Sequence, residues 1–277
     1  MNVYIIGNGI TGVSAALKIQ KIQPSWNITI ISGESNYHYC RPALMYIFMG
    51  HMRYKDTKPY EDYFWKLNNI NLMRDWIKEV DFVNKILTFQ NNRSVRYDIL
   101  LIATGSKSNK FGWPGQDLNG VQGFYDLMDL NLFYENTKNT KNAVIVSGDL
   151  IGIELAEMLH TRNIHVTFLV RENSYLDNVL PKEESVMINR VINSEHMDLL
   201  LETELKEIVD DGKGRVSAVI TNKNEKADCE FVGLTAGVSP NIDLVRDTDL
   251  LTGRGILVEW SLKTQIEDVI QRVIVLR

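Results

Sequence analysis

Short apolar runs alternate along this chain with segments of helical spacing. Residues 3–6, 28–31 and 98–104 are nearly continuous hydrophobic runs, the pattern of strands buried on both faces of a parallel sheet. Residues 11–23 have the spacing of a helix, which Pro24 should end. Residues 41–50 predict a second helix, with Pro42 in its first turn. This alternation predicts an α/β fold in which helices cover a parallel sheet.

A second unit with the same rhythm begins near residue 142. Residues 142–160 predict a strand, a tight turn and a helix, and residues 165–170 predict the next strand. Residues 199–232 are rich in strand patterns, with a turn at 210–215. Segments rich in Gly and Pro at 110–120 and a turn-like segment at 234–241 indicate boundaries between units.

Composition narrows the classes of function. The 277 residues are 44% hydrophobic and 23% charged, and the net charge is −5. This balance argues against nucleic acid and anionic membranes as partners, and no apolar run approaches the roughly 20 residues that span a bilayer. Cys40 and Cys229 form no close pair, so we expect no metal site and no dithiol centre. A reducing cytoplasm fits this cysteine usage best.

The first turn carries candidate chemistry. Gly7, Gly9 and Gly12 form a G-x-G-x-x-G pattern between a buried strand and a helix. In that setting the first glycine allows the tight turn, the second lets a diphosphate approach the backbone, and the third allows close packing of helix and strand. The helix start supplies free N–H groups to the phosphates. Glu34, near the end of the second strand, is the candidate acceptor for ribose hydroxyls. The alternative is a plain Gly-rich turn.

Further motifs follow in order along the chain. They are "YCRPALMYIFMG" at 39–50, "YDILLIATGS" at 97–106, "WPG" at 113–115, the turn before Glu154, and "AGVSPNIDL" at 236–244. Together with the glycine turn they resemble the FAD-dependent pyridine nucleotide-disulfide oxidoreductases. The resemblance is strongest to the branch of rubredoxin reductases, NADH oxidases and nitrite-reductase flavodomains.

The resemblance implies a fold and a reaction. The fold would be two Rossmann-like dinucleotide-binding domains: an FAD domain in two segments, 1–112 and 236–277, with an NAD(P)H domain at 113–235 inserted between them. The reaction would pass electrons from NAD(P)H through FAD to a small redox protein or a small-molecule acceptor. In such relatives a C-terminal interface domain often forms the dimer contact, so a homodimer is an open alternative.

The resemblance also implies site residues, although it singles out no catalytic side chain. Those implied at the FAD site are Gly7, Asn8, Gly9, Ile10, Thr11, Gly12, Glu34, Ser35, Arg41, Pro42, Ile77, Ala103, Thr104 and Gly105. The residues implied as cofactor-binding around the second turn are Gly148, Ile151, Gly152, Glu154 and Glu172, and Gly237 is implied as cofactor-binding at the start of the second FAD segment.

The second turn departs from the family pattern. Ser147 and Asp149 stand where the first two glycines are expected, and only Gly152 remains. A carboxylate about 4 Å from a phosphate charge costs on the order of 4 kcal/mol near a protein surface, or roughly a thousandfold in affinity. Alternatively, Asp149 is simply a helix N-cap that satisfies the donors a phosphate would take. Both interpretations predict that NAD(P)H binding is weak or lost.

The choice between NADH and NADPH rests on two adjacent residues. Glu172 lies twenty residues after Gly152, the spacing of a ribose-binding acid in an NAD site. Arg171 could instead meet a 2′-phosphate. We favour NAD.

Other reactive side chains receive structural interpretations. Some relatives use one redox cysteine in this region, but Cys40 precedes the Arg-Pro pair instead of lying in the helix, so a small packed residue is favoured. His38 and His51 are expected at the surface, and the aromatic residues in the core are Tyr60, Tyr63, Phe64 and Trp65.

The last residues also depart from the family pattern. After Val269 relatives continue with an aromatic residue, small residues and a Gly-Asp pair that holds the FAD ribitol, whereas this chain has residues 270–277. Suitable codons shifted by one base would restore that pattern. We therefore expect a lost nucleotide near Val269, a C-terminally truncated chain without the interface domain, and a poorly held flavin half. The apolar residues 273–276 would add a strand to the FAD sheet.

Overall fold

A computed structural model describes residues 1–271, and the chain divides into two compact units. Unit 1 contains Met1–Cys40, Arg53–Lys107 and the segment from Ser239; unit 2 contains Arg41–Met52 and Ser108–Val238. The chain passes from unit 1 to unit 2 within β8 (Ser106–Ser108) and returns to unit 1 within β17 (Val238–Pro240). These two strands pair with each other. The predicted boundaries at 112 and 235 lie a few residues from these crossings. Residues 273–276, for which a strand is predicted, lie outside the described range.

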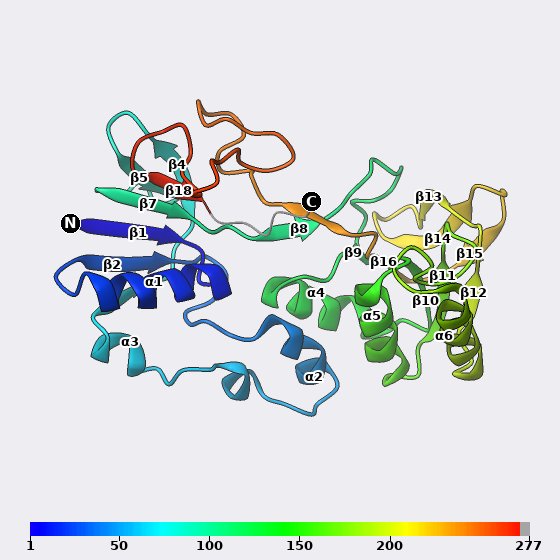
Figure 1. Ribbon diagram of the computed structural model, residues 1–277. Coiled ribbons are helices and arrows are strands. Elements are labelled where there is room, and N and C mark those ends of the chain that lie inside the picture. The colour runs from blue at the N-terminus through cyan, green and yellow to red at the C-terminus, as the bar shows by residue number, and fades with distance from the viewer. Residues whose placement is uncertain (272–277) are drawn as a thin grey trace. The chain divides into compact units, whose positions relative to one another are not determined.

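Unit 1 is built on a parallel sheet in the order β18-β7-β1-β2-β3 (Figure 1). Its strands are β1 (Asn2–Ile6), β2 (Asn27–Ile31), β3 (Ile70–Met73), β7 (Ile99–Ile102) and β18 (Val269–Gln271). The predictions of buried strands at 3–6, 28–31 and within 98–104 are confirmed. The edge strand β18 was not predicted, and it brings residues from the end of the described chain beside β7, with Val269 opposite Leu100.

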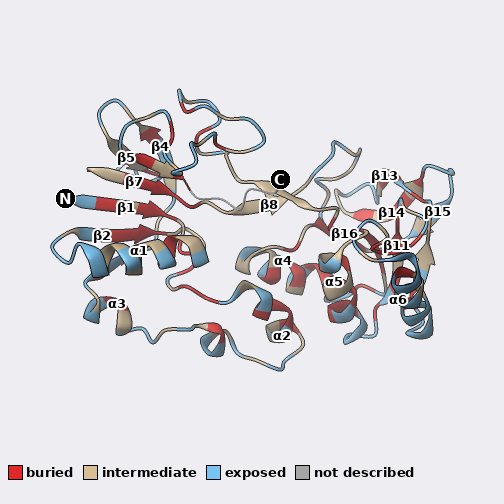
Figure 2. Cartoon of the chain, viewed as in Figure 1, coloured by how far each residue is buried: buried red, intermediate tan, exposed pale blue. Residues whose placement is uncertain are grey.

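Two cores cover the faces of this sheet because successive side chains on a strand point to opposite sides. Val3 and Ile5 pack with Val13 and Ala16 of α1 (Ile10–Ile22). Ile6 packs on the opposite side. Figure 2 shows β1 and β2 mostly buried and much of α1 exposed. Also in unit 1 are the 3-10 turn η2 (Tyr54–Thr57) and the short helix α3 (Phe64–Leu67).

A small antiparallel sheet contributes to the second of these cores. Its strands are β4 (Ile77–Asp81), β5 (Ile86–Phe89) and β6 (Ser94–Arg96). The segment that returns to unit 1 after β17 completes the core with side chains distant in sequence. These side chains are Val245, Leu250, Ile256 and Val269. The core of unit 1 therefore depends on both of its major segments.

Unit 2 has a parallel sheet in the order β12-β11-β10-β16-β9. The strands are β9 (Val121–Gln122), β10 (Asn142–Val146), β11 (His165–Leu169), β12 (Asp198–Leu200) and β16 (Phe231–Leu234). A three-stranded antiparallel sheet follows β12 and consists of β13 (Leu205–Asp210), β14 (Val216–Thr221) and β15 (Lys226–Asp228). The predicted strand at 165–170 and the strand-rich region at 199–232 are confirmed.

The helices of unit 2 are α4 (Leu127–Thr137), α5 (Leu150–His160), α6 (Lys182–Ser194) and the short α2 (Leu44–Phe48), which follows the 3-10 turn η1 (Arg41–Ala43). Phe48 joins α2 to this unit through Phe133, with ring centroids 4.7 Å apart. Helix α5 is confirmed, whereas the helix predicted over 41–50 is a 3-10 turn followed by five helical residues. Within residues 1–271 no helix has the length and apolar character needed to cross a bilayer.

Three predictions about individual side chains are wrong. His38 is buried rather than exposed, because its Nδ1 lies 2.8 Å from the carbonyl oxygen of Asn8. Tyr63 is 66% exposed and does not belong to the core. Cys40 is exposed, not packed.

Candidate functional site

The first glycine loop joins β1 to α1 in unit 1. Gly7 has a φ of +113°, which glycine adopts without a steric penalty. A Cβ at Gly7 would lie 2.1 Å from the carbonyl oxygen of Ala103, and one at Gly12 would lie 2.0 Å from the carbonyl oxygen of Gly7. Loop, helix and β7 thus approach so closely that neither position accepts a side chain without a backbone shift.

Gly9 has a different environment. It is the N-cap of α1, with extended backbone and no side chain to cap the helix. Within residues 1–271, and apart from its two chain neighbours, no atom lies within 4 Å of the position that its Cβ would take. The predicted residues Ile10 and Thr11 begin the helix beside this open space, at the positive end of the helix dipole. An open cradle next to backbone N–H groups fits the diphosphate of a dinucleotide.

Asn8 holds the loop against the segment that follows β2. Its side-chain nitrogen donates to the carbonyl oxygen of Ser35 at 3.1 Å and to the Ser35 hydroxyl at 2.9 Å. Both residues are buried. His38 contacts the carbonyl oxygen of Asn8 as well, so these hydrogen bonds hold the loop in place without a ligand. Asn8 and Ser35 are therefore residues that support the loop.

Glu34 lies just beyond the end of β2, where the ribose-binding acid is predicted. Its carboxylate accepts a hydrogen bond from the Tyr39 hydroxyl. The adjacent Gly33 packs under the indole of Trp76, since a Cβ there would lie 2.1 Å from the ring. Trp76 is 47% exposed and directly precedes Ile77, the first residue of β4. No sequence motif marks Trp76, which offers an apolar surface beside the predicted adenine contact.

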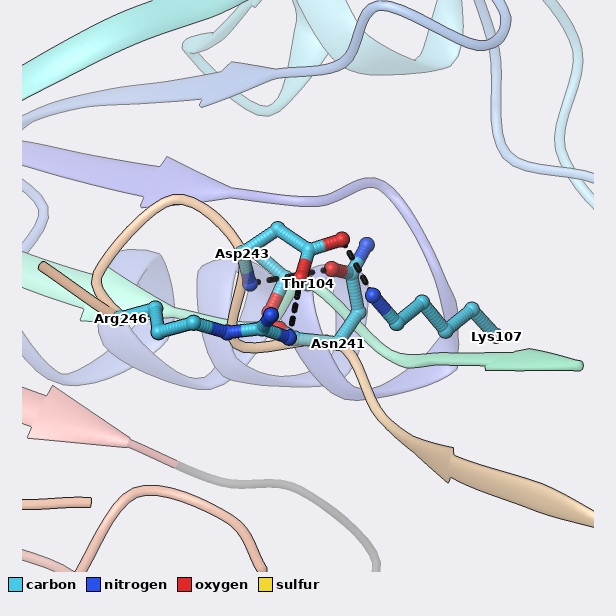
Figure 3. Close-up of polar contacts among 5 residues, drawn as sticks. All are labelled: Thr104, Lys107, Asn241, Asp243 and Arg246. Atoms are coloured by element: carbon cyan, nitrogen blue, oxygen red, sulfur yellow. Dashed lines mark hydrogen bonds and ion pairs between the residues drawn. The ribbon is translucent and has the colours of Figure 1, made fainter. Parts of the chain in front are cut away.

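The end of β7 is tied to the returning segment of unit 1, and Figure 3 shows the polar contacts. The Thr104 hydroxyl donates to the carbonyl oxygen of Asn241 at 2.6 Å, and the Asn241 N–H donates to the carbonyl oxygen of Gly105 at 2.9 Å. Asp243 forms ion pairs with Lys107 and with Arg246. Thr104 and Gly105 therefore join the two main segments of unit 1, next to the glycine loop that contacts Ala103.

Arg41 and Pro42 belong to unit 2. The Arg41 guanidinium donates to the carbonyl oxygen of Tyr125 at 3.2 Å and lies 4.8 Å from the centroid of its ring. The glycine loop belongs to unit 1, so contact of Arg41 and Pro42 with a flavin stays a prediction.

A cavity of about 580 Å³ lies in unit 2 beyond the ends of its parallel strands. Two of the residues predicted around the second turn, Gly148 and Glu172, line it, and so does Gly237, which was predicted to bind a cofactor from the second FAD segment. Side chains that carried no sequence motif complete the lining, notably Phe111, Trp113, Thr203 and Glu204. Of the other predicted residues, Ile151 and Gly152 begin α5, and Glu154 lies in its second turn.

Asp149 occupies the start of α5 with its own side chain. Its Oδ1 accepts from the N–H of Ile151 at 3.1 Å and, at longer range, from the N–H of Gly152 at 3.4 Å. The Asp149 N–H donates to the Ser147 hydroxyl at 3.1 Å, and the Tyr175 hydroxyl donates to the Asp149 carbonyl oxygen at 2.7 Å. The N-cap alternative is therefore the observed one. The donors are taken and a carboxylate lies beside them, so the start of α5 does not fit a dinucleotide diphosphate.

The second site is acidic. The carboxylates of Asp149, Glu172 and Glu204 line the cavity, and among the described residues one cationic side chain, Arg171, lines it with them. Arg171 is paired with Glu172 at 2.7 Å. Burial raises the pKa of the Asp149 carboxyl above its ordinary value, although the hydrogen bonds it accepts oppose the shift. Burial also raises the pKa of Glu154, with neighbouring carboxylates adding to the effect.

Two parallel α/β units, each with a strand–turn–helix at the carboxyl ends of its strands, define a protein of the two-domain dinucleotide-binding class. Residues 1–270 match the family model described as pyridine nucleotide-disulphide oxidoreductase, and the chain belongs to that family. The resemblance carried by the ordered motifs is thus confirmed.

The chain is similar to longer proteins of this family. It is 28% identical over 264 residues to a nitrite reductase [NAD(P)H] of Bacillus subtilis, covering 95% of this chain and 32% of that protein. It is 26% identical over 268 residues to an NADH-rubredoxin oxidoreductase of Clostridium acetobutylicum, covering 96% of this chain and 66% of that protein. A ferredoxin reductase structure from Rhodopseudomonas palustris has the same fold, with a TM-score of 0.88, 21% identity, and coverage of 98% of this chain and 67% of that one.

Proposed function

We propose that this chain is the nucleotide-binding part of an FAD-dependent oxidoreductase that transfers electrons from NAD(P)H through flavin to a small redox protein or another acceptor. Family membership supports the reaction class. The named relatives are reductases of nitrite and of rubredoxin, which supports the acceptor class. Bound FAD would supply the hydride acceptor and the one-electron donor, which no side chain can provide.

The observation that carries the proposal is the open cradle at Gly9. The N–H groups at the start of α1 would bind the FAD diphosphate, because Gly9 places no side chain between them and the ligand. Glu34 would accept hydrogen bonds from the ribose hydroxyls, and Asn8 would keep the loop in place through Ser35.

Gly9→Ala tests this assignment. Apart from its chain neighbours, the new methyl group meets no atom of the described part of the chain within 4 Å, so the fold should tolerate it at a cost of up to about 1 kcal/mol for a poorer N-cap. It would stand where the diphosphate approaches, so we expect the affinity for FAD and ADP, measured by calorimetry, to fall at least about tenfold.

Gly253→Ala is the matched control in the same unit. Its new Cβ would make only an ordinary contact of 3.5 Å with Leu257. It should leave both affinities unchanged. Equal ADP and FAD binding by wild type and Gly9→Ala would contradict the proposal.

A second candidate function is nucleotide binding with impaired turnover of NAD(P)H. The side chain of Asp149 at the start of α5 favours it, because it opposes the diphosphate of the electron donor. Anaerobic addition of NADH to the flavin-loaded protein separates the two candidates. Loss of flavin absorbance at micromolar NADH supports the oxidoreductase, whereas reduction by dithionite alone supports impaired turnover.

The setting of the protein is part of the proposal. Two cysteines without a disulfide are consistent with a reducing, cytoplasmic compartment. A homodimer is a further expectation, which light scattering of the purified protein would test.

A further inference from the structure

The two glycine loops of this chain are built in opposite ways. At the first, the N-cap position has no side chain and the space beside it is open. At the second, the equivalent donors bind Asp149, and a Cβ at Gly152 would lie 2.2 Å from the Ser147 hydroxyl and 2.6 Å from the Tyr175 hydroxyl. Ser147 and Tyr175 therefore fill the space under the second loop and hold it in its self-capped form.

The self-capped loop nevertheless borders a cavity large enough for a ligand. About 580 Å³ lies within the usual range for small-molecule sites of roughly 300–1,000 Å³. The lining combines apolar surface from Val146, Leu169 and Leu205 with the rings of Phe111 and Trp113. Such a surface suits a planar base.

Glu172 supplies a second recognition element. It follows β11, and its Oε2 lies 3.1 Å from the position of a Cβ on Gly148, so the carboxylate sits against the loop itself. A carboxylate at the end of the second strand can accept hydrogen bonds from both hydroxyls of a ribose. Glu172 is paired with Arg171, but Asp149 and Glu204 keep the lining net negative, which opposes an anionic ligand.

We propose that the unit 2 cavity binds a ribonucleoside without a phosphate, uncharged or cationic, and that Asp149 occupies the position that phosphate takes elsewhere in such folds. Asp149 is then the residue that determines specificity at this site. The carboxylate disfavours nucleotides both by its charge and by holding the backbone donors, so this inference goes with the second candidate function, in which turnover of NAD(P)H is impaired. Every residue involved belongs to unit 2, so the inference does not depend on flavin binding in unit 1.

Adenosine, nicotinamide riboside, ADP and NADH are suitable probes. The protein is first saturated with FAD. Hydrogen exchange is then measured in peptides that cover Ser147–Gly152, so binding at the second loop is distinguished from binding at the first loop, Gly7–Gly12. We expect at least one of the two nucleosides to protect the second loop at concentrations about tenfold lower than ADP does. If the protein takes up no FAD, protection at the second loop still reports on this site alone.

Two substitutions separate charge from donor occupancy. Asp149→Gly removes both obstacles and should strengthen ADP and NADH binding about a hundredfold or more. It should change binding of the uncharged adenosine by less than about threefold, and it should weaken binding of the cationic nicotinamide riboside. Asp149→Asn keeps a capping oxygen and removes the charge, so its gain should be smaller. If Asp149→Gly does not fold, Asp149→Asn still tests the proposal.

Asp126 offers matched controls. It caps α4 in the same unit, accepting from the N–H groups of Met128 and Asp129 at 2.9 Å, and it does not line the cavity. Asp126→Gly and Asp126→Asn should lower the melting temperature about as much as the Asp149 variants do. They should leave the affinities for all four ligands unchanged. Three results would overturn the proposal. They are wild-type binding of ADP at the second loop as tight as that of the tighter-binding nucleoside, no binding of either nucleoside at millimolar concentration, and no gain in affinity for ADP in either Asp149 variant.

Discussion

At the scale of the residue, the N-cap residue decides whether the backbone N–H groups at the start of each helix are available to a ligand. Gly9 leaves the start of α1 open, and Asp149 closes the start of α5 with its own carboxylate. The two loops share a strand–turn–helix setting, so the contrast comes from the side chains and not from the backbone plan. Burial also differs sharply between chemically identical residues, as the two cysteines illustrate.

Cys40 and Cys229 should react differently with iodoacetamide. Cys40 is exposed, whereas Cys229 is buried, and burial raises the pKa of its thiol to about 12. Only thiolates react appreciably. At pH 8 the native protein should therefore take up one label, at Cys40, and the second only after unfolding. Mass spectrometry of labelled peptides checks this, with Cys40→Ser as the control that should remain unlabelled when folded. Two labels at equal rates in the native protein would contradict it.

The raised pKa of Cys229 also predicts that the stability of the protein depends on pH. An unfolded chain ionises Cys229 near its ordinary pKa of about 8.5, whereas the folded chain holds it neutral up to about 12. The unfolded state therefore binds fewer protons between these values, so the free energy of unfolding should fall as pH rises through this range. Cys229→Ala should lose this part of the slope in urea titrations at pH 8 and 10.

At the scale of the element, the contact between α1 and its loop depends on the absence of side chains. Gly12, in the first turn of the helix, lies against the carbonyl oxygen of Gly7, and Gly7 in turn lies against Ala103. The helix, the loop and β7 are therefore one packed group. Backbone atoms, unlike a flexible side-chain end, cannot move aside cheaply.

Gly12→Ala should destabilise the protein although alanine is the better helix former. The added Cβ would lie 2.0 Å from the Gly7 oxygen, so the helix must shift, and we expect a loss of about 1–3 kcal/mol or more in the free energy of unfolding. Urea denaturation measures the loss. Gly9→Ala, which adds the same methyl group into open space three residues earlier, is the comparison, and an equal loss for both would contradict the packing described.

At the scale of the whole molecule, the chain leaves unit 1, builds most of unit 2 and returns. The returning segment provides buried side chains for the core of unit 1, including Leu250 and Val269, and the strand β18 at the sheet edge. The polar contacts of Asn241 and Asp243 fasten its beginning (Figure 3). Unit 1 therefore lacks a complete core until residues far apart in sequence meet.

Leu250→Ala tests this dependence. Leu250 is 3% exposed, and its truncation should lower the stability of unit 1 by about 2–5 kcal/mol through the cavity left behind. Hydrogen exchange should accelerate in β1 and β7 of unit 1. Exchange in β10 of unit 2 should change less. The neighbouring Leu251, 55% exposed, gives the control: Leu251→Ala should have little effect. Similar losses for the two variants would contradict the assigned core.

Sequence patterns predicted the central strands and the first loop because their causes are local. A continuous apolar run such as residues 28–31 is buried on both faces wherever the sheet places it, and Gly12 is required by the nearby carbonyl oxygen of Gly7, within the same loop. The helix α6 was missed because few of its residues are buried, Ser185 and Ile192 among them, and its remaining positions are mostly polar or exposed. His38 was misjudged because the partner that buries it, Asn8, lies thirty residues away.

The sequence by itself determined the α/β plan, the family, and the fact that Asp149 interrupts the second glycine pattern. Only the tertiary structure decided which of two interpretations of Asp149 holds, and that a cavity with Glu172 and Trp113 opens beside it. It also decided that Trp76 covers Gly33 and that Leu250 belongs to the core of unit 1. Backbone sterics and hydrophobic periodicity act over a few residues, so they can be predicted from the local sequence. Burial and hydrogen-bond partnership are set by residues that become neighbours only when the chain has folded.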